Sequence, residues 1–338
     1  MTITALSDVD PCEAKFAQVA EVLESAHTVT ILCHVQPDAD TIGSGLALGL
    51  VLERRGVSVQ VAFSRPSALP ESMCDFPGVH LLTAPADVRE SVDVLVTVDV
   101  GSEGRLGELA SRLAGAHRTI VLDHHRSNSE FGTINVVDET AASTTALIAR
   151  FFDVWGVAID RDIAHCLYAG LVTDTGSFRW GGPLPHVLAA RLLATGIDGD
   201  AIARKLLDTH PFGWLPMLAS VLGSAVLVPE AADGRGLVYA VIRRSDIGDL
   251  RSEEIESVVD IVRTTSEAEV AAVLKESVSG SWSISLRAKS AIDVSAVAES
   301  LGGGGHRLSA GYTSTTSSDE IVAALVAALG GIRGIERI

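Results

Sequence analysis

The first half of this chain contains four largely apolar segments that each end in an aspartate or a histidine, and this repeated pattern constrains the fold more than any other feature. Short apolar runs rich in β-branched residues are typical of buried strands. In open α/β sheets, ligands bind beyond the carboxyl ends of the strands, so polar residues at these ends are candidates for a functional site. The segments are VTILC before His34, DVLVTV before Asp99, RTIVL before Asp123, and LYAGLVT before Asp174.

Helix-like stretches alternate with these strand-like runs. One begins at Thr41 and stops at Gly56, a residue type common just after helix ends. Two more cover residues 138–156 and 161–174, the second of which delivers Asp174. Alternation of this kind is typical of βαβ units. We therefore expect an α/β fold whose N-terminal domain has a doubly wound, mainly parallel sheet.

After Trp180 the sequence changes character. Residues 184–222 are helical and apolar, with several prolines between the helical stretches, and we interpret residues 184–219 as a helical connector. The connector separates a first domain at residues 1–183 from a smaller α+β domain at residues 220–338. The elements expected in the smaller domain are strands at residues 224–230, 236–244, 268–277 and 281–289, and helices at residues 251–263, with Ser252 as N-cap, and 293–301.

Composition narrows the class of protein. The 338 residues are 47% hydrophobic but only 4% aromatic, which favours an interior of alanine, valine and leucine packed helix on sheet. No apolar run approaches the roughly 20 residues of a membrane-spanning helix. The N-terminus carries Asp8, Asp10 and Glu13 where a secretory signal would be basic. The four cysteines form no CxxC pair and are interpreted as reduced thiols. We expect a cytoplasmic protein that does not associate with membranes.

The formal net charge of −17 limits the partners. Long nucleic acids bind mainly through many lysine and arginine contacts to phosphate, so a strongly acidic chain is a poor match for them. A small phosphorylated ligand remains compatible, because local cations or metal ions can overcome the overall field. We therefore expect no long nucleic acid among the partners.

The loop HVQPDAD places His34, Asp38 and Asp40 within seven residues, between a strand and a helix. Such a loop is able to turn all three side chains toward one metal ion, but it also fits a solvated turn whose aspartate caps the helix. Asp99 has a similar alternative, hydrogen bonding to Arg105 or to a helix N-terminus, and Asp174 another as a turn or cap residue. Of the adjacent His124 and His125, one can ligate a metal while the other faces a substrate.

Together these residues form a ligand set of four carboxylates and two imidazoles without sulfur. Such a set suits Mn²⁺, with Mg²⁺, Fe²⁺ and Co²⁺ as competitors. Six ligands exceed the need of one catalytic ion that must keep open positions, whereas two ions sharing a carboxylate fit the count. A pair of ions is a common device for in-line attack on phosphorus by a bridging hydroxide. The proposed metal ligands are His34, Asp38, Asp40, Asp99, His124 and Asp174.

A glycine run near the C-terminus is a second candidate site. In LGGGGHRLSAGY, the glycines allow backbone N–H groups to approach an anion closely. His306, Arg287 and Lys289 would add charge-assisted contacts. The alternative is a flexible connection between a helix and a strand. We favour an anion-binding segment that includes Gly303, Gly304 and Gly305.

The motifs HVQPDAD, TVD, DHH, TDTGSF and GGGGH occur in this order, and with them the chain resembles the DHH phosphoesterase superfamily with a C-terminal DHHA1 domain. The resemblance covers nearly the whole chain. The stretch DHHRSNSEFGTINVVD, with the STT that follows, is similar to the branch of nanoRNases, phosphatases of 3′-phosphoadenosine-5′-phosphate (PAP) and cyclic dinucleotide phosphodiesterases. The resemblance implies a DHH domain, a DHHA1 domain and an active site in the cleft between them.

The resemblance also implies roles for individual residues. His125 would face the scissile phosphate, with Asp123 orienting a histidine ring, so that Asp99, His125 and Asp123 form the catalytic set. Arg287, His306 and the glycines would bind a terminal phosphate or a base. One Mn²⁺ would be held by His34, Asp38 and Asp99, and the other by Asp40, Asp99, His124 and Asp174, with Asp99 as the bridge. Arg105, Arg126, Asn128 and Arg179 would either contact phosphate or support the loops.

The activity that follows is Mn²⁺-dependent hydrolysis of cyclic di-AMP and short oligoribonucleotides such as pApA to mononucleotides, together with conversion of PAP to AMP. Superfamily exonucleases that act on long strands carry extra domains, and the manganese pyrophosphatases have a different second domain, so the substrate should be a small nucleotide. The alternatives are a non-hydrolytic cyclic dinucleotide sensor, a phosphatase acting mainly on PAP, and an RNA-binding accessory domain, which the acidic charge disfavours. The apolar segment around Phe212, Trp214 and Leu215 is able to pack either within the chain or against a second copy, and we expect a homodimer.

Overall fold

The computed structural model describes residues 12–66, 68–277 and 280–331. Asp8 and Asp10, on which the expectation about a signal peptide rests in part, lie outside these ranges. The chain divides into two compact units between Thr209 and His210. Across the described ranges, no helix has both the length and the apolar character needed to cross a membrane.

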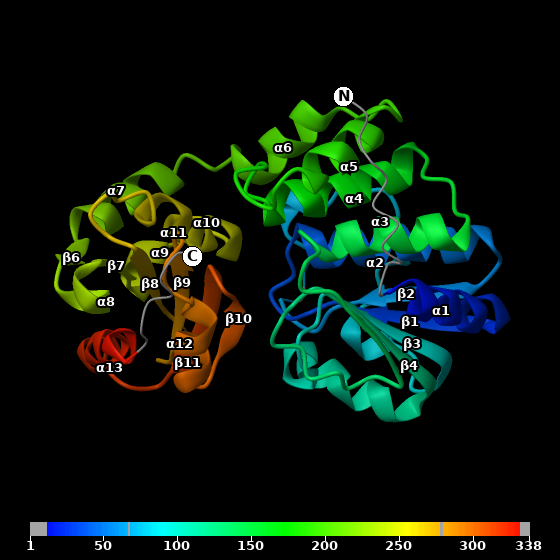
Figure 1. Cartoon of the computed structure of the whole chain (residues 1–338), viewed down its shortest axis with the longest axis horizontal. Helices are drawn as coiled ribbons and strands as arrows, with labels where there is room; N and C mark the ends of the chain where they lie inside the picture. The colour runs from blue at the N-terminus through cyan, green and yellow to red at the C-terminus, as the bar shows by residue number, and fades with distance from the viewer. Residues whose placement is uncertain (1–11, 67, 278–279, 332–338) are drawn as a thin grey trace. The chain divides into compact units, whose positions relative to one another are not determined.

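The first unit is built on a parallel sheet of five strands in the order β2-β1-β3-β4-β5 (Figure 1). The expected α/β architecture with a parallel N-terminal sheet is therefore confirmed. The short strand β5 was not expected. The strands are β1 (Thr28–Leu32), β2 (Ser58–Ala62), β3 (Val92–Val98), β4 (Ala116–Asp123) and β5 (Ile134–Val137).

Alternate strand residues face opposite sides of this sheet and enter two separate cores. Ile31 and Val96 point into the larger core, which is shared with the α-helices of this unit. Leu32 and Leu95 point into a smaller core that is closed by the 3₁₀ segment η4 (Glu103–Gly115). Figure 1 shows α2, α3 and α4 together on one side of the sheet. The helices of the first unit are α1 (Glu13–Ser25), α2 (Ala39–Arg54), α3 (Thr144–Trp155), α4 (Arg161–Asp174), α5 (Leu184–Leu193) and α6 (Gly199–Leu207), and three short 3₁₀ turns are η1 (Glu71–Met73), η2 (Val79–Leu81) and η3 (Pro85–Asp87).

Asp174 ends a helix, as the helix-like pattern of residues 161–174 predicted, and does not end a strand. The run LYAGLVT before it forms the second half of α4, and its residues from Leu167 to Val172 are buried. An apolar run that is buried on all sides lacks the alternation that separates strands from helices, which explains why the sequence fitted both. α4 nevertheless brings Asp174 to the same edge of the sheet as the strand-end residues.

The second unit has a mixed sheet of six strands in the order β10-β11-β9-β8-β7-β6. Only β7 and β8 pair in parallel; the other neighbours are antiparallel. Helices cover both faces, with α8, α12 and α13 over one core and α7, α10 and α11 over the other. The strands are β6 (Val226–Val228), β7 (Leu237–Ile242), β8 (Val270–Glu276), β9 (Trp282–Ala288), β10 (Gly304–His306) and β11 (Ser309–Ser314), and the helices are α7 (Trp214–Gly223), α8 (Ala231–Gly234), α9 (Arg244–Ile247), α10 (Ser252–Glu256), α11 (Val258–Val262), α12 (Val294–Ser300) and α13 (Ser318–Gly330).

Two details of the second half differ from the sequence expectation. The apolar residues of α5 and α6 pack in the larger core of the first unit, whereas Met217 and Val221 of α7 pack in the second unit. Residues 184–219 are therefore shared between the units and are not a separate connector. The helix expected over residues 251–263 is divided at Ser257 into α10 and α11. Its N-cap is Arg251, not Ser252, because the Glu254 carboxylate accepts the Arg251 N–H at 3.0 Å.

Candidate metal centre

The turn after β1 and the start of α2 place His34, Asp38 and Asp40. Asp38 is the N-cap of α2, and its Oδ1 accepts the N–H groups of Asp40 and Thr41, each at 3.1 Å. Its Oδ2 lies 3.5 Å from Nε2 of His34. The cap and the ligand interpretations of this loop are thus compatible, because the two oxygens of Asp38 are used differently.

Asp99 follows the last residue of β3 and lies between two histidines. Its Oδ2 is 3.4 Å from Nε2 of His34, and its Oδ1 is 3.5 Å from Nε2 of His124. The residue has a φ of +61°, a left-handed conformation that is uncommon outside glycine and is often found at functional sites. Its N–H donates to the Leu122 carbonyl at 3.0 Å, which holds the turn against the neighbouring strand.

A second group surrounds Nε2 of His124. Asp174 Oδ2 lies 3.2 Å away and Asp40 Oδ2 3.9 Å away. The six side chains predicted as ligands therefore converge in two groups that meet at Asp99. One group contains His34, Asp38 and Asp99, and the other contains Asp40, His124 and Asp174.

In both groups a backbone carbonyl orients the imidazole ring, on the side of the ring that faces away from the carboxylates. Nδ1 of His34 lies 2.8 Å from the Val35 carbonyl, and Nδ1 of His124 lies 3.1 Å from the Ala141 carbonyl. A carbonyl can only accept a hydrogen bond, so each Nδ1 carries a proton. The Nε2 atom of each ring therefore faces the carboxylates, where it could give up its own proton to a metal ion. Metal-ligating histidines are commonly held in this way.

Burial and mutual repulsion raise the pKa values of two carboxylates in the cluster. Burial, followed by the charges of Asp174 and Asp99, raises the pKa of Asp40 well above its ordinary value. Burial also raises the pKa of Asp174, to about 6, against the opposing effect of His124. Burial alone would lower the pKa of His34, but Asp38 and Asp99 raise it to about 10. This balance shows a buried site with excess negative charge.

The donor set fits divalent metal ions. Asp40, Asp99, His34 and His124 are each at most 5% exposed, and buried carboxylates at these separations require compensating positive charge. Oxygen donors with some imidazole nitrogen are the ligands that Mn²⁺ and similar divalent ions accept. The residues present are therefore chemically suited to hold metal ions in both groups.

His125 and Asp123 form a separate arrangement beside the ligands. Oδ1 of the fully buried Asp123 accepts from Nδ1 of His125 at 2.7 Å and from the N–H of His124 at 2.8 Å. Its Oδ2 accepts from the Asn128 side chain at 2.6 Å. Nδ1 of His125 is also 3.5 Å from Oδ1 of Asp99. Asp123 thus fixes the ring of His125 next to the cluster.

The basic and amide residues whose roles were left open lie in different surroundings. Nη2 of Arg105 is 3.2 Å from Nδ1 of His34, so Arg105 contacts a predicted ligand from behind. Asn128 supports Asp123. Arg126 is exposed, with its Nε 4.0 Å from Glu139, and Arg179 lies in the turn after α4, where its N–H donates to the Thr175 carbonyl.

Two residues of this site were missed by the sequence reasoning. Thr144 and Thr145, at the start of α3, donate hydrogen bonds to the carboxylates of Asp40 and Asp99. The signal available in the sequence was the STT motif, in which a serine precedes a helical pattern as an N-cap. Ser143 does cap α3, accepting the Ala146 N–H at 3.0 Å.

The residues predicted to bind substrate in the second unit lie on neighbouring strands. Arg287 is on β9, paired in register with Ser309 of β11, and Gly304, Gly305 and His306 form β10 at the edge of the sheet. The N–H groups of Gly302 and Gly303 donate to carbonyls at the end of α12, at 3.1 and 2.8 Å. These two N–H groups are therefore engaged in the helix end, so Gly303 does not offer its N–H to an anion in this structure.

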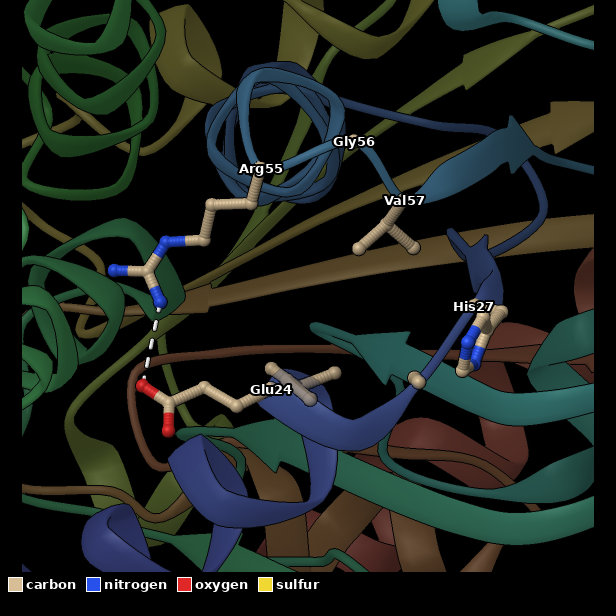
Figure 2. A pocket seen from close by; sticks show the side chains of 7 residues that line it. Glu24, His27, Arg55, Gly56 and Val57 are labelled. Atoms are coloured by element: carbon tan, nitrogen blue, oxygen red, sulfur yellow. Dashed lines mark hydrogen bonds and ion pairs between the residues drawn. The ribbon is translucent and has the colours of Figure 1, made fainter.

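A pocket of about 280 Å³ lies elsewhere in the first unit, between the end of α1 and the start of β2 (Figure 2). Its most polar feature is the ion pair between Arg55 and Glu24 at 3.4 Å, and Arg55 also stacks on the ring of Trp155. The pocket lies at the amino ends of β1 and β2, the opposite edge of the parallel sheet from the predicted ligands. It is therefore separate from the candidate metal centre.

Comparison with known families identifies both halves of the chain. Residues 28–171 match the model of the DHH family N-terminal domain, and residues 234–331 match the DHHA1 domain. The chain therefore belongs to the DHH/DHHA1 phosphoesterases, and it is a hydrolase that acts on phosphoric ester bonds.

Several DHH/DHHA1 proteins of known name or structure are similar to this chain over most of its length. The chain is 29% identical over 302 residues to the bifunctional oligoribonuclease and PAP phosphatase NrnA of Thermus thermophilus, with 88% of each chain covered. It is 25% identical to the cyclic-di-AMP phosphodiesterase GdpP of Geobacillus thermodenitrificans, covering 85% of this chain and 44% of that protein. Among solved structures, an exopolyphosphatase-related protein from Bacteroides fragilis superposes with a TM-score of 0.83 at 26% identity, covering 94% of this chain and 96% of that one.

Proposed function

We propose that this enzyme is a Mn²⁺-dependent phosphodiesterase that hydrolyses short oligoribonucleotides and cyclic di-AMP to mononucleotides and converts PAP to AMP. The observation that carries the proposal is the position of Asp99, with one oxygen facing His34 and the other facing His124. A carboxylate shared in this way is what two adjacent metal positions require. The activities for which the NrnA and GdpP relatives are named supply the substrate class.

We assign His34, Asp38 and Asp99 to one metal position, and Asp40, Asp99, His124 and Asp174 to the other. Divalent ions held there would lower the pKa of water and neutralise charge on the phosphoryl oxygens. The buried carboxylates would hold the ions, and the carbonyls behind His34 and His124 would keep both rings in the ligating tautomer.

His125 supplies the proton in this mechanism. Water that has given up a proton to solvent would attack phosphorus and form one P–O bond, and the ester P–O bond would break. The leaving oxygen would take a proton from His125, which solvent would then reprotonate. The hydrogen bond to Asp123 orients the imidazole and stabilises its charged form, as a carboxylate does behind a catalytic histidine. Asp123 in turn is held by Asn128. We propose that Arg287 and His306 bind the nucleotide's terminal phosphate or base.

Parallel kinetics on pApA, cyclic di-AMP and PAP, with Mn²⁺ and with EDTA, test this proposal. We expect turnover of all three substrates with Mn²⁺ and none with EDTA. Binding of cyclic di-AMP without release of AMP would instead favour a sensor, and turnover confined to PAP would make the enzyme a PAP phosphatase. Selective binding of long RNA at physiological salt would favour an accessory RNA-binding role.

We also propose that the protein acts in the cytoplasm as a homodimer. Trp214 packs within its own chain, because its Nε1 donates to the Glu254 carbonyl at 3.2 Å. Phe212 and Leu215, by contrast, are 84% and 54% exposed. Light scattering on the wild-type protein and on Phe212→Ser tests the dimer, which the substitution should weaken. A wild-type monomer at micromolar concentration would contradict it.

A further inference from the structure

The start of α3 contacts carboxylates from both groups of predicted ligands. Asp40 accepts the N–H of Thr144 on Oδ2 at 2.6 Å, and on Oδ1 the N–H of Thr145 at 2.9 Å and its hydroxyl at 2.7 Å. The Thr144 hydroxyl points to a different carboxylate and donates to Oδ1 of Asp99 at 2.8 Å. Thr144 is thus hydrogen-bonded to Asp40 through its backbone and to Asp99 through its side chain.

These hydrogen bonds act where the negative charge is most concentrated. Asp40 is completely buried among other carboxylates, and the N-terminus of a helix offers both free N–H groups and a favourable dipole to such an anion. Ser143, Thr144 and Thr145 are themselves buried, so water does not compete for these contacts. The Ser143 hydroxyl lies 2.7 Å from that of Thr145 and restricts its rotation.

The Thr144 hydroxyl donates its hydrogen bond to only one of the two carboxylate oxygens of Asp99. Oδ1, which accepts it, is the oxygen that lies 3.5 Å from Nε2 of His124, whereas Oδ2 faces His34. The hydroxyl therefore fixes the rotation of the Asp99 carboxylate about its Cβ–Cγ bond. Together with the N–H bond to Asp40, it also fixes the distance between one carboxylate at the end of β3 and another at the start of α2.

We propose that Thr144 is a positioning residue. It holds the carboxylates of Asp40 and Asp99 at a fixed distance and orientation, and so forms the metal position around His124. The inference rests on the proposed function, because it assumes two metal positions that share Asp99. It predicts an asymmetry: loss of the Thr144 hydroxyl weakens the position formed with Asp40, His124 and Asp174, and leaves the position at His34 and Asp38 largely unchanged.

Mn²⁺ binding by calorimetry and electron paramagnetic resonance tests the inference without relying on turnover. The wild-type protein should bind two ions with an exchange-coupled spectrum. In Thr144→Val, which keeps the backbone N–H and side-chain volume, the second ion should bind about 10- to 100-fold more weakly and the coupled signal should be lost. Thr144→Ser, which restores the hydroxyl, should regain both.

Thr30→Val is the matched control, because Thr30 is a buried threonine on β1 whose hydroxyl has no hydrogen-bond partner among the described residues. It should bind two ions like the wild type. If Thr144→Val does not fold, Thr144→Ala removes the same hydroxyl without adding bulk and must give the same result. Two ions bound with unchanged affinity and coupling in a folded Thr144 variant would overturn the inference alone. A wild-type protein that binds only one ion would overturn the dinuclear function, and this inference with it.

Discussion

Asp123 and His125 are joined by a 2.7 Å hydrogen bond from Nδ1 of the imidazole to Oδ1 of a fully buried carboxylate. The same oxygen accepts the N–H of His124. Asp123 therefore fixes the backbone of one histidine and the ring of the next, which gives the two adjacent imidazoles different surroundings.

Replacing Asp123 with asparagine tests whether Asp123 acts through His125 and not through the metal ligand His124. The amide keeps the shape but no longer stabilises a charged His125, so we expect kcat to fall on the order of 100-fold. Mn²⁺ affinity should change much less, because Asp123 is outside both groups of proposed ligands. Steady-state kinetics combined with calorimetry measure the two effects. A loss of metal binding as large as the loss of kcat would show that Asp123 serves the metal position instead.

Gly170 on α4 is expected to matter for the same site. A Cβ at this position would lie 2.5 Å from Oδ1 of Asp40, so Gly170→Ala must displace that carboxylate. We expect a loss of roughly 1–3 kcal/mol in stability together with weaker Mn²⁺ binding. Gly43→Ala is the control, because its Cβ would meet the Cys166 carbonyl at 2.3 Å instead. Both variants should melt earlier, but only Gly170→Ala should lose metal affinity; equal affinities in the two would refute the prediction.

Arg287 is predicted to act on substrate and not on metal. Its Nε is 3.8 Å from Asp260, which holds the guanidinium beside α11. We expect Arg287→Ala to raise KM for pApA about tenfold, because a charge-assisted contact to phosphate is lost, with Mn²⁺ affinity unchanged. Arg287→Lys should recover part of the effect. Initial-rate kinetics measure this, and an unchanged KM in the alanine variant would exclude Arg287 from the binding site.

The pair of Arg150 and Asp138 is expected to make stability depend on pH. Burial would raise the pKa of Asp138, but hydrogen bonds from Thr140 and Arg150 lower it below its ordinary value. A carboxyl group with a lowered pKa in the folded state stabilises above its unfolded pKa, near 3.9, and this contribution is lost as the pH falls through the folded value.

Asp138→Asn should therefore lower the free energy of unfolding at pH 7 by about 1–2 kcal/mol. The difference from the wild type should shrink as the pH falls below about 4. Urea unfolding of both proteins in EDTA, from pH 7 to below about 4, measures this difference in the free energy of unfolding. A difference that stays constant with pH would mean that the carboxylate charge contributes nothing.

The strand-end residues could be predicted from sequence because their positions follow from local patterns. Apolar runs that end in Asp99 and Asp123 define both the strands and the edge at which their carboxylates meet, and a parallel sheet brings them together without further information. The same logic placed His34. Asp174 was anticipated as a ligand at the end of the helix-like stretch 161–174, which is α4 in the structure.

The contacts of Thr144 and Thr145 could not be predicted in this way. Each lies more than 100 residues from Asp40 in sequence, at separations of 104 and 105, and the contact depends on how α3 packs against both α2 and α4. The hydrogen bonds of the Gly302 and Gly303 N–H groups to the end of α12 could not be predicted either. A glycine run is compatible both with a helix end and with an anion site.

The most direct test of the account is a titration of metal-free enzyme with Mn²⁺ while AMP release from pApA is measured. Because Asp99 offers one oxygen to each histidine, we predict that activity appears only as a second equivalent binds and saturates at two ions per chain. Full activity at one equivalent, or activity that persists in EDTA, would contradict the central claim that two metal positions share Asp99.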